Sequence, residues 1–494
     1  MSRHQRLTLG AAILGSAIAT IDGSIVNVAL PAIERDLGGG LSAQQWVSNA
    51  YLLTLASLVL VGGSLGDIYG ERRVFVIGVG AFGALSVACA VAPTMGVLIA
   101  ARALQGIAGA LVTPSSLAVI VAAFPPKERG AAVGSWTAWG GIASIFGPLA
   151  GGVIVDRISW RWIFALNVPL VAVTIALILA AVAPTHRERN RRVDVVGATL
   201  CTLGLGGISF GLIEEPHYGW VSAVILVPLA GGLALFASFL AYERRASQPM
   251  LRLELFTHRN FAAGNIETLA MYAGLGILFF FLVIFLQQVA GYSALESGVA
   301  TLPATLVMFA LSKRFGALAD RYGPRFFMGA GPLVAAAGIL LLLRTGMHTS
   351  FAADLIPGIL VFAVGLSLTV APLTATVLAD ADESDAGIAS AINNAVARVA
   401  SLIGISLVGV IVASMLVHDT FARNADSVHA FHSVLMICAG LVAAGGLVGA
   451  LGIVNPKRAV EAEDCSGGQL VGVPKPAAGC REDQPPEIAA ITST

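Results

Sequence analysis

The sequence predicts an all-α polytopic membrane protein with fourteen transmembrane helices in two related halves. Only 12% of its 494 residues are charged and 56% are hydrophobic, whereas a soluble domain carries roughly 25% charged residues. Apolar stretches of about 20 residues, long enough to cross the hydrocarbon core as helices, recur along almost the whole chain. A ten-residue pattern occurs twice, as GSLGDIYGER at 63–72 and as GALADRYGPR at 316–325, with six identical positions. Related halves of this kind are typical of transporters that bind substrate between the halves.

Composition also argues against several other classes of protein. The formal net charge is zero, so no nucleic-acid partner is predicted. The five cysteines show neither CxxC nor metal-ligand spacing, and we expect no metal site and no cofactor. The chain contains no GxxxxGK[ST] sequence, so ATP hydrolysis is not predicted.

The apolar runs define the predicted spans and their orientation. In order, the spans cover residues 8–30, 44–65, 74–93, 95–122, 131–154, 162–183, 194–214, 220–242, 261–287, 296–312, 326–344, 353–378, 390–415 and 431–454. Lysine and arginine gather before the first span and after the second, fourth, sixth, eighth, tenth and fourteenth, as they do in cytoplasmic loops. The remaining loops hold only Arg35, Arg157, Arg161, Arg344 and Arg423. We therefore predict a multi-pass protein of the bacterial cytoplasmic (inner) membrane with both termini in the cytoplasm.

The positions of the two repeat copies predict the domain organisation. The first copy follows the second span and the second copy follows the tenth, although two six-helix halves alone would place it after the eighth. Two helices are therefore expected between two six-helix bundles. We predict an N-terminal bundle at 1–183, a linker with two inserted helices at 184–260, a C-terminal bundle at 261–454, and a disordered cytoplasmic tail at 455–494.

The repeated pattern also has a local physical interpretation. Gly63 and Gly70 permit a tight turn and close helix approach. Asp67 is predicted near the start of the third span, where the helix dipole favours a carboxylate by about 0.3–1 kcal/mol. Arg72 keeps the loop in the cytoplasm. The loop is either an ordinary cytoplasmic turn or an element with a function of its own, and its repetition favours a function.

Charged residues inside the spans are the candidates for proton coupling. Asp22 is costly in the first span, because an Asp at the bilayer centre costs about 2.5–3.5 kcal/mol. From the helical rise it lies roughly 12 Å below the outer end, and Arg102 lies at a similar depth of roughly 10 Å in the fourth span. We expect them to pair, with Asp22 either a structural partner or a group that alternates between protonated and ionised forms. Glu267, about two turns into the ninth span, is either a second protonatable site or a side chain that extends to the membrane surface.

The fifth span contains GSWTAWGGIASIFGPLAGG, which is rich in helix-bending and small residues. Pro148 removes a backbone donor and bends a helix. Gly134, Gly147, Gly151 and Gly152 permit close contact with a facing helix. The run is either a functional bend between the halves or a generic kinked packing helix.

Four stretches in order resemble the fourteen-helix drug:proton antiporter branch of the major facilitator superfamily. They are ATIDGSIVNVALP in the first span, GSLGDIYGERR after the second, RALQGIAGA in the fourth, and the glycine-rich run of the fifth. The resemblance spans about residues 8–454 and implies the major facilitator fold, in which two six-helix bundles here flank two additional helices.

The resemblance also implies roles for individual residues. We assign proton coupling to Asp22, Arg102 and Glu267, and the substrate pathway to Asn27 and Gln105. The resemblance implies a conformational latch at Gly63, Asp67, Gly70 and Arg72 in the first copy, with Asp320 and Arg321 in the second. It implies an antiporter motif at Gly134, Gly147, Pro148, Gly151 and Gly152. The chain departs from the usual pattern at Ile68 and Glu71, which replace basic residues, and at Ala143, which replaces a glycine.

Together these features predict a proton-coupled secondary antiporter that exports hydrophobic small molecules, such as drugs, antibiotics or toxic metabolites, by alternating access. Its expected partners are the substrate, protons and membrane lipids, and it is expected to act as a monomer. A proton-coupled importer on the same fold is the first alternative, which the antiporter motif disfavours. A membrane-embedded lipid-modifying enzyme is the second, and the lack of a suitably spaced acidic cluster disfavours it. We expect a protein that is not an enzyme, and the sequence does not identify the substrate.

Overall fold

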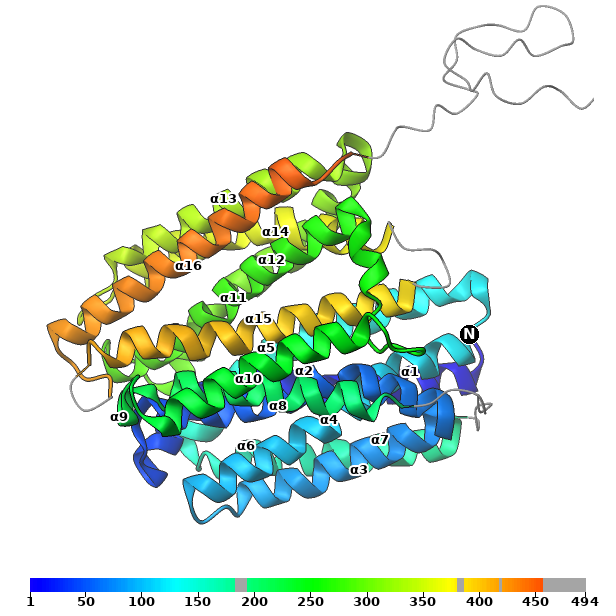
Figure 1. Cartoon of the computed structure of the whole chain (residues 1–494), viewed down its shortest axis with the longest axis horizontal. Helices are drawn as coiled ribbons and strands as arrows, with labels where there is room; N and C mark the ends of the chain where they lie inside the picture. Colours follow the sequence, from blue (N-terminus) through cyan, green and yellow to red (C-terminus); the bar gives the residue numbers. More distant parts are fainter. Residues whose placement is uncertain (183–192, 380–385, 417–419, 456–494) are drawn as a thin grey trace, which may run out of the picture. The chain divides into compact units, whose positions relative to one another are not determined.

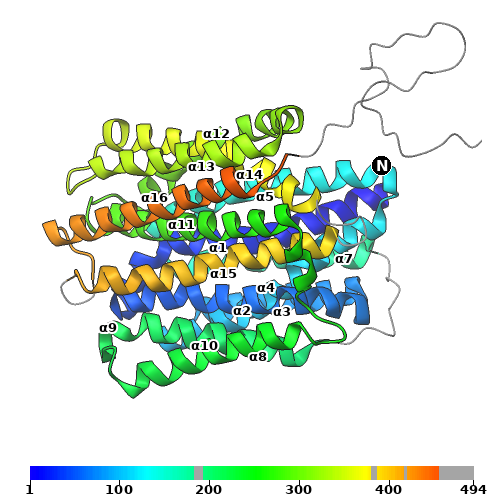
Figure 2. The ribbon, with the colours of Figure 1, turned by 45° about the horizontal axis from the view of Figure 1, so that its top comes forward.

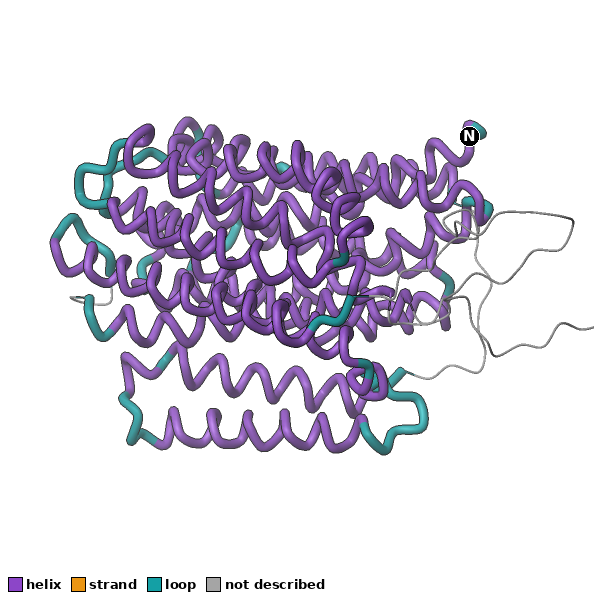
Figure 3. Tube along the Cα trace, turned by 90° about the horizontal axis from the view of Figure 1, so that it is seen from above, coloured by secondary structure: helices purple, strands orange, loops and turns teal. Residues whose placement is uncertain are grey.

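The structure is a computed structural model that describes residues 1–182, 193–379, 386–416 and 420–455. Within these ranges every regular element is a helix, as Figure 3 shows, and 14 helices are long and apolar enough to cross a membrane. The predicted all-α fold with fourteen spans is confirmed. Predictions for the segment 183–192 and for the tail beyond residue 455 lie outside the described residues.

Along the chain we divide the helices into a first group, a pair that we call the inserted pair after its predicted position, and a last group. The division into two six-helix bundles stays a prediction. The first group comprises α1 (Arg3–Leu37), α2 (Gly40–Tyr69), α3 (Glu71–Ala90), α4 (Met95–Ala123), α5 (Pro126–Arg157), α6 (Arg161–Ala165) and α7 (Asn167–Ala181). The inserted pair is α8 (Val195–Ile213) and α10 (Ala223–Glu243), joined through the short α9 (Glu215–Tyr218). The last group follows the turn η1 (Leu253–Thr257) and comprises α11 (Arg259–Gln288), α12 (Ala294–Tyr322), α13 (Pro324–Leu341), η2 (Leu342–Arg344), η3 (Phe351–Leu355), α14 (Ile356–Ala379), α15 (Ala386–Ala413) and α16 (Ala425–Gly452).

The long helices run back and forth between two ends of the bundle (Figure 1). We call the end at which α1 begins the terminal face, because the N-terminus lies there. We call the end at which α1 finishes and α12 begins the opposite face. This definition allows the positions of side chains along the bundle to be compared without assuming the orientation of the membrane.

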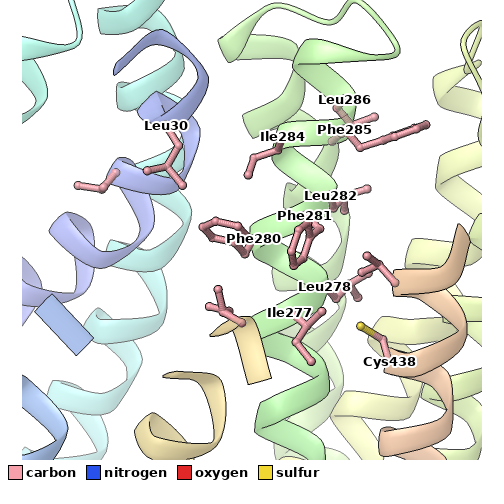
Figure 4. Close-up of a cluster of buried hydrophobic side chains, with 14 of the residues drawn as sticks. Leu30, Ile277, Leu278, Phe280, Phe281, Leu282, Ile284, Phe285, Leu286 and Cys438 are labelled. Carbon is pink, nitrogen blue, oxygen red and sulfur yellow. The ribbon is translucent and has the colours of Figure 1, made fainter. Parts of the chain in front are cut away.

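One apolar core continues from the first group into the last. Leu30 of α1 belongs to the same buried cluster as Phe280, Phe281 and Phe285 of α11. Figure 4 shows Leu30 and Phe280 on the facing sides of the two helices, whereas Phe285 points away from α1. Phe285 stacks on Phe431 of α16 with ring centroids 4.0 Å apart. Because lipid tails are as apolar as these side chains, close packing rather than removal of apolar surface from water holds such helices together.

The inserted pair packs against the seam between the two groups. Figures 1 and 2 show α8 and α10 side by side, and α8 also contacts α2 of the first group and α15 of the last. Glycines permit the close approach of the pair. A Cβ atom at Gly204 would lie 2.8 Å from the backbone nitrogen of Phe236, and one at Gly207 would lie 2.5 Å from the carbonyl oxygen of Pro228. Small residues at such crossings are typical of membrane helices.

Candidate functional site

The centre of the candidate site is an ion pair between α1 and α4. Arg102 Nη1 lies 2.5 Å from Asp22 Oδ2, and the two side chains are 1% and 0% exposed. The sequence-based prediction that these residues meet is confirmed. Because a charge buried without its partner is strongly disfavoured, each residue fixes the other in the bundle.

Neutral polar side chains complete the coordination of this pair. Gln105 Oε1 accepts a hydrogen bond from Arg102 Nη1 at 2.6 Å, and Gln105 Nε2 donates to Ser86 Oγ at 2.9 Å. Asn167 Nδ2 donates to Asp22 Oδ1 at 3.0 Å. All five side chains are buried, so the helices α1, α3, α4 and α7 meet at one polar network. We call these five residues the buried polar network.

The arginine also contacts aromatic rings and a backbone carbonyl. Its Cζ atom lies 4.4 Å from the centroid of the Tyr51 ring and 5.8 Å from that of Phe164, and Arg102 Nε donates to the carbonyl oxygen of Val47 at 3.2 Å. Cation–π contact is strongest where water is excluded. Tyr51 belongs to α2, which also packs against α15 of the last group.

Helical spacing explains why α4 can supply two members of the network. Arg102 and Gln105 are three residues apart and therefore share a face. The next turn presents Gly106, whose position is in direct contact with Thr54 Oγ1 and the Tyr51 carbonyl of α2. A larger residue at position 106 would separate α2 from α4 and move the Tyr51 ring away from the arginine.

The two residues predicted to line the substrate pathway differ in exposure. Gln105 is fully buried within the network. Asn27 is partly exposed, and its Oδ1 accepts a hydrogen bond from Ser48 Oγ at 3.3 Å. Their assignment to the substrate pathway stays a prediction, and Asn27 is the one whose side chain reaches an exposed surface in this conformation.

Glu267 occupies a different environment in the last group. Its side chain is 0% exposed, and neither carboxyl oxygen has a hydrogen-bond partner among the described residues. Glu267 packs against Gly449 of α16, because a Cβ atom there would be 2.6 Å from Glu267 Oε2. Met328 of α13 contacts the same glycine, with its carbonyl oxygen 2.5 Å from that Cβ position. The alternative in which Glu267 extends to the surface is therefore wrong, since these packed helices enclose it.

The repeated pattern forms two equivalent breaks between helices. Gly70 has φ 91° and Gly323 has φ 90°, a conformation that favours glycine. Arg72 Nη2 donates to the carbonyl oxygen of Leu179 at 3.0 Å, near the end of α7. Arg325 Nε donates to that of Ala450 at 2.6 Å, near the end of α16. In each half the repeated arginine therefore binds the last helix of its own half.

One part of the sequence-based account of this loop is wrong. Asp67 lies in the last turn of α2 and not near the start of α3, because the helix continues beyond the apolar run to Tyr69. The stabilisation by the positive end of a helix dipole does not apply there. Gly63 also lies within α2, whereas Asp320 and Arg321 lie at the end of α12 and are exposed. Their role as a latch stays a prediction.

Glycines of α5 contact helices of both groups. Gly147 is in contact with Ser24, and a Cβ atom at Gly151 would lie 2.5 Å from Ile25 Cγ1, both on α1. Gly152 is in direct contact with the backbone of Leu295 at the start of α12. Pro148 also touches α12, because a Cβ atom at Gly298 would be 2.5 Å from the Pro148 carbonyl oxygen. By contrast, Gly134 has open space around it.

Hydrogen bonds close the bundle toward the opposite face. Asp156 at the end of α5 accepts hydrogen bonds from the backbone nitrogens of Ala294 (3.0 Å) and Leu295 (2.9 Å), the first two residues of α12. Gln287 Nε2 of α11 donates to the carbonyl oxygen of Val28 in α1 at 2.9 Å. Asn49 Nδ2 of α2 donates to Ser406 Oγ of α15 at 3.0 Å. Each bond joins the first group to the last.

Sequence reasoning missed several of these residues. Asn167 could have been identified from the sequence, because it interrupts an apolar run at a depth close to that of Arg102. Ser86 and Tyr51 could not have been identified in this way, because single hydroxyl groups are common in spans and carry no charge that demands a partner. Asp156 was missed because it lies beside the basic residues of a predicted outer loop, where an acidic residue is unremarkable.

The fold and the buried site define a class, a multi-pass helical membrane transporter. The profile of the Major Facilitator Superfamily matches residues 12–405. The chain is 36% identical over 417 residues to the multidrug resistance protein Stp of Mycobacterium tuberculosis, covering 84% of this chain and 77% of that protein. It is 33% identical to the tetracenomycin C resistance and export protein of Streptomyces glaucescens, covering 84% and 77% of the two chains. The chain therefore belongs to the Major Facilitator Superfamily.

Solved structures agree with this fold. A bacterial homologue of the human lysosomal transporter Spinster, in an inward-facing and unoccupied conformation, superposes with a TM-score of 0.66 at 14% identity. The match covers 92% of this chain and 97% of that one. At this identity the likeness supports the fold alone, while relatives named for drug and antibiotic resistance support efflux as the general activity. The expectation that the protein is a transporter and not an enzyme is confirmed.

Proposed function

We propose that this protein is a proton-coupled antiporter that exports hydrophobic small molecules across the cytoplasmic membrane of a bacterium. In this proposal the terminal face is cytoplasmic, and the positions of lysine and arginine support that orientation. The hydrogen bonds at the opposite face then close the protein toward the outside. The names of the relatives support drugs and antibiotics as the class of substrate.

The observation that carries proton coupling is the buried ion pair between Asp22 and Arg102. A proton that binds Asp22 removes the negative charge that Arg102 needs, and breaking such a pair costs about 3–5 kcal/mol. One proton that moves inward supplies about 2.3 kcal/mol per 100 mV of membrane potential and about 1.4 kcal/mol per pH unit. The energy that one proton supplies is similar to the cost of breaking the ion pair, so a single proton can drive the rearrangement.

Glu267 is proposed as a second proton site. An ionised carboxylate without a partner is expensive in an apolar interior, so the neutral acid is the form compatible with its surroundings. Asp22 is held in the opposite way, as the partner of a guanidinium. A transport cycle in which one site is ionised while the other is protonated would link the two halves through the proton.

The remaining predicted residues support the conformational part of the cycle. The antiporter motif of α5 lies where the first group meets α12, through Pro148 and Gly152. Closure at this contact would limit leakage when the cytoplasmic side is open. We propose Asn27 as a substrate contact, because its side chain is partly exposed on the same helix as Asp22.

The experiment that tests this function has two stages. A host that lacks its own exporters is screened with cationic dyes, antiseptics and antibiotics to find a compound against which the protein protects. That compound is then followed in proteoliposomes with an imposed pH gradient. We expect Asp22→Asn to abolish gradient-driven export, and Asp36→Asn, an exposed ion-pair residue of the same helix, to leave it unchanged.

The same vesicles decide between export and import. A gradient that is acidic on the outer side should drive export of the compound in exchange for protons. Accumulation together with protons would instead support the importer, and full gradient-driven export by Asp22→Asn would refute Asp22 as the coupling residue.

A further inference from the structure

Two carboxyl groups meet at the terminal-face end of the inserted helices. Glu243 is the last residue of α10, and Asp194 immediately precedes α8 as its N-cap. The two helices run antiparallel and pack together (Figure 1), which brings the end of one beside the start of the other. Neither residue belongs to the buried polar network or to the repeated loops.

Each carboxyl group uses one oxygen to bind backbone. Asp194 Oδ1 accepts from the Gly197 nitrogen at 2.8 Å, the usual bond of an N-cap. Glu243 Oε2 accepts from the Leu251 nitrogen at 2.9 Å. Glu243 thus fixes the segment that follows α10, residues 244–258, which we call the linker.

The other two oxygens are buried and lie side by side. Glu243 is 3% exposed. Glu243 Oε1 and Asp194 Oδ2 accept no hydrogen bond from a donor in the described part of the chain. A Cβ atom at Gly197 would lie 2.5 Å from the first and 2.6 Å from the second, so both oxygens face the same point beside α8. A hydrogen bond between them would satisfy both. Two acceptor oxygens can form such a bond only if a proton lies between them.

No ion pair joins either carboxyl group to a lysine or arginine within the described ranges. On α8 the nearby titratable group is the Cys201 thiol, and on α10 it is the Tyr242 hydroxyl. Arg244 and Arg245 follow directly but are exposed. From α15 the surroundings are apolar, with Leu402, Val399 and Ile403 in the adjacent cluster. Two ionised carboxylates at this distance would repel each other.

We propose that Asp194 and Glu243 form a proton-binding site that holds one proton between them and thereby fixes the linker to the inserted helices. The proton joins the two carboxyl groups, and Glu243 in turn accepts a hydrogen bond from the Leu251 nitrogen. When the proton is lost, two negative charges share one buried site and Glu243 is driven from the linker. The site thus makes the connection between the inserted pair and α11 sensitive to pH at the terminal face, whatever the coupling role of Asp22.

Hydrogen–deuterium exchange of the full chain in lipid nanodiscs tests this site. The amides of residues 250–252 are followed across a pH series and corrected for the intrinsic exchange rate. We expect protection to fall about tenfold as the pair loses its proton, the change that corresponds to one pKa unit of coupling. Glu243→Gln should remove this step, because the amide donates to Asp194 and accepts from the linker at every pH.

Two further variants keep the test decisive. Asp194→Asn supplies an amide donor from the other side, so it should also remove the pH step if Glu243→Gln fails to fold. Glu254→Gln makes the same chemical change at an exposed linker carboxylate and should retain the wild-type step. A linker whose protection does not depend on pH in the wild type, or a step that survives in both amide variants, would overturn the proposal.

Discussion

Asp156 should control how readily the bundle opens at the opposite face. Its carboxylate spans the two groups of helices and binds the first two backbone nitrogens of α12 at 3.0 and 2.9 Å. These nitrogens have no partner within their own helix, so Asp156 acts as a cap that the first group provides for a helix of the last. Opening the opposite face must break both bonds.

The magnitude follows from the nature of this cap. Loss of a capping side chain costs about 0.5–2 kcal/mol, and the attraction of a carboxylate to the helix dipole adds about 0.3–1 kcal/mol at an exposed site. Asp156 is exposed, so we expect Asp156→Ala to weaken the closed state by about 1–2 kcal/mol. That change multiplies the ratio of open to closed molecules by about 5–30.

The assay is a spin-label distance measurement across the opposite face in lipid nanodiscs. Labels at Ile158→Cys and Met347→Cys, both exposed positions, report the separation of the two groups. The native Cys89, Cys201 and Cys438 are buried and are replaced by alanine in the background, as are the two cysteines of the tail. The fraction of molecules with the longer separation should rise in Asp156→Ala.

A matched control separates this effect from a general loss of order. Asp354 also binds a backbone nitrogen with its carboxylate, that of Ser350 at 2.7 Å, but within the last group alone. Asp354→Ala should leave the distance distribution unchanged. Equal effects of the two variants, or no shift in Asp156→Ala, would refute the view that Asp156 holds the halves together.

Three other substitutions test the packing of the halves and of the buried site. Gly152→Val should prevent closure of the opposite face, because the α12 backbone occupies the space that the new side chain needs. Its control, Gly134→Val, meets open space and should not change the distance between the spin labels at positions 158 and 347. Gly323→Ala should destabilise the protein by about 1–2 kcal/mol, because φ there is 90°. Its control, Gly96→Ala at an unhindered helical position, should not lower the unfolding temperature. Arg102→Lys keeps the charge but not the planar set of donors, so loss of two hydrogen bonds at about 0.5–1.5 kcal/mol each should lower the unfolding temperature.

The buried ion pair was predictable because helical rise converts a sequence position into a depth. Asp22 and Arg102 had similar expected depths, and both carry charges that demand a partner in an apolar medium. Depth does not give the rotation of a helix about its axis. For that reason the sequence could not show that Tyr51 and Ser86 face the same point, or that Glu267 faces inward against α16.

Helix ends were less predictable than helix number. The polar repeat pattern was interpreted as a loop, yet α2 continues to Tyr69 and α12 to Tyr322. The reason is physical, because hydrophobicity marks only the part of a helix that lies in hydrocarbon. The backbone hydrogen bonds of a helix continue into the interface between membrane and water, where polar residues such as Asp67 are favourable. Only Gly70 and Gly323, with their positive φ angles, mark the true ends.

The two halves share a frame and differ in the charges placed inside it. Both use a glycine with positive φ and an arginine bound to the last helix of its half, which explains why these positions match in the repeat. The buried carboxyl groups do not match. Asp22 is paired with an arginine and three neutral partners share its network, whereas Glu267 has no partner among the described residues. In the antiport cycle that we propose, this difference would matter, because a carboxyl group beside a guanidinium and one in apolar surroundings bind a proton with different affinities.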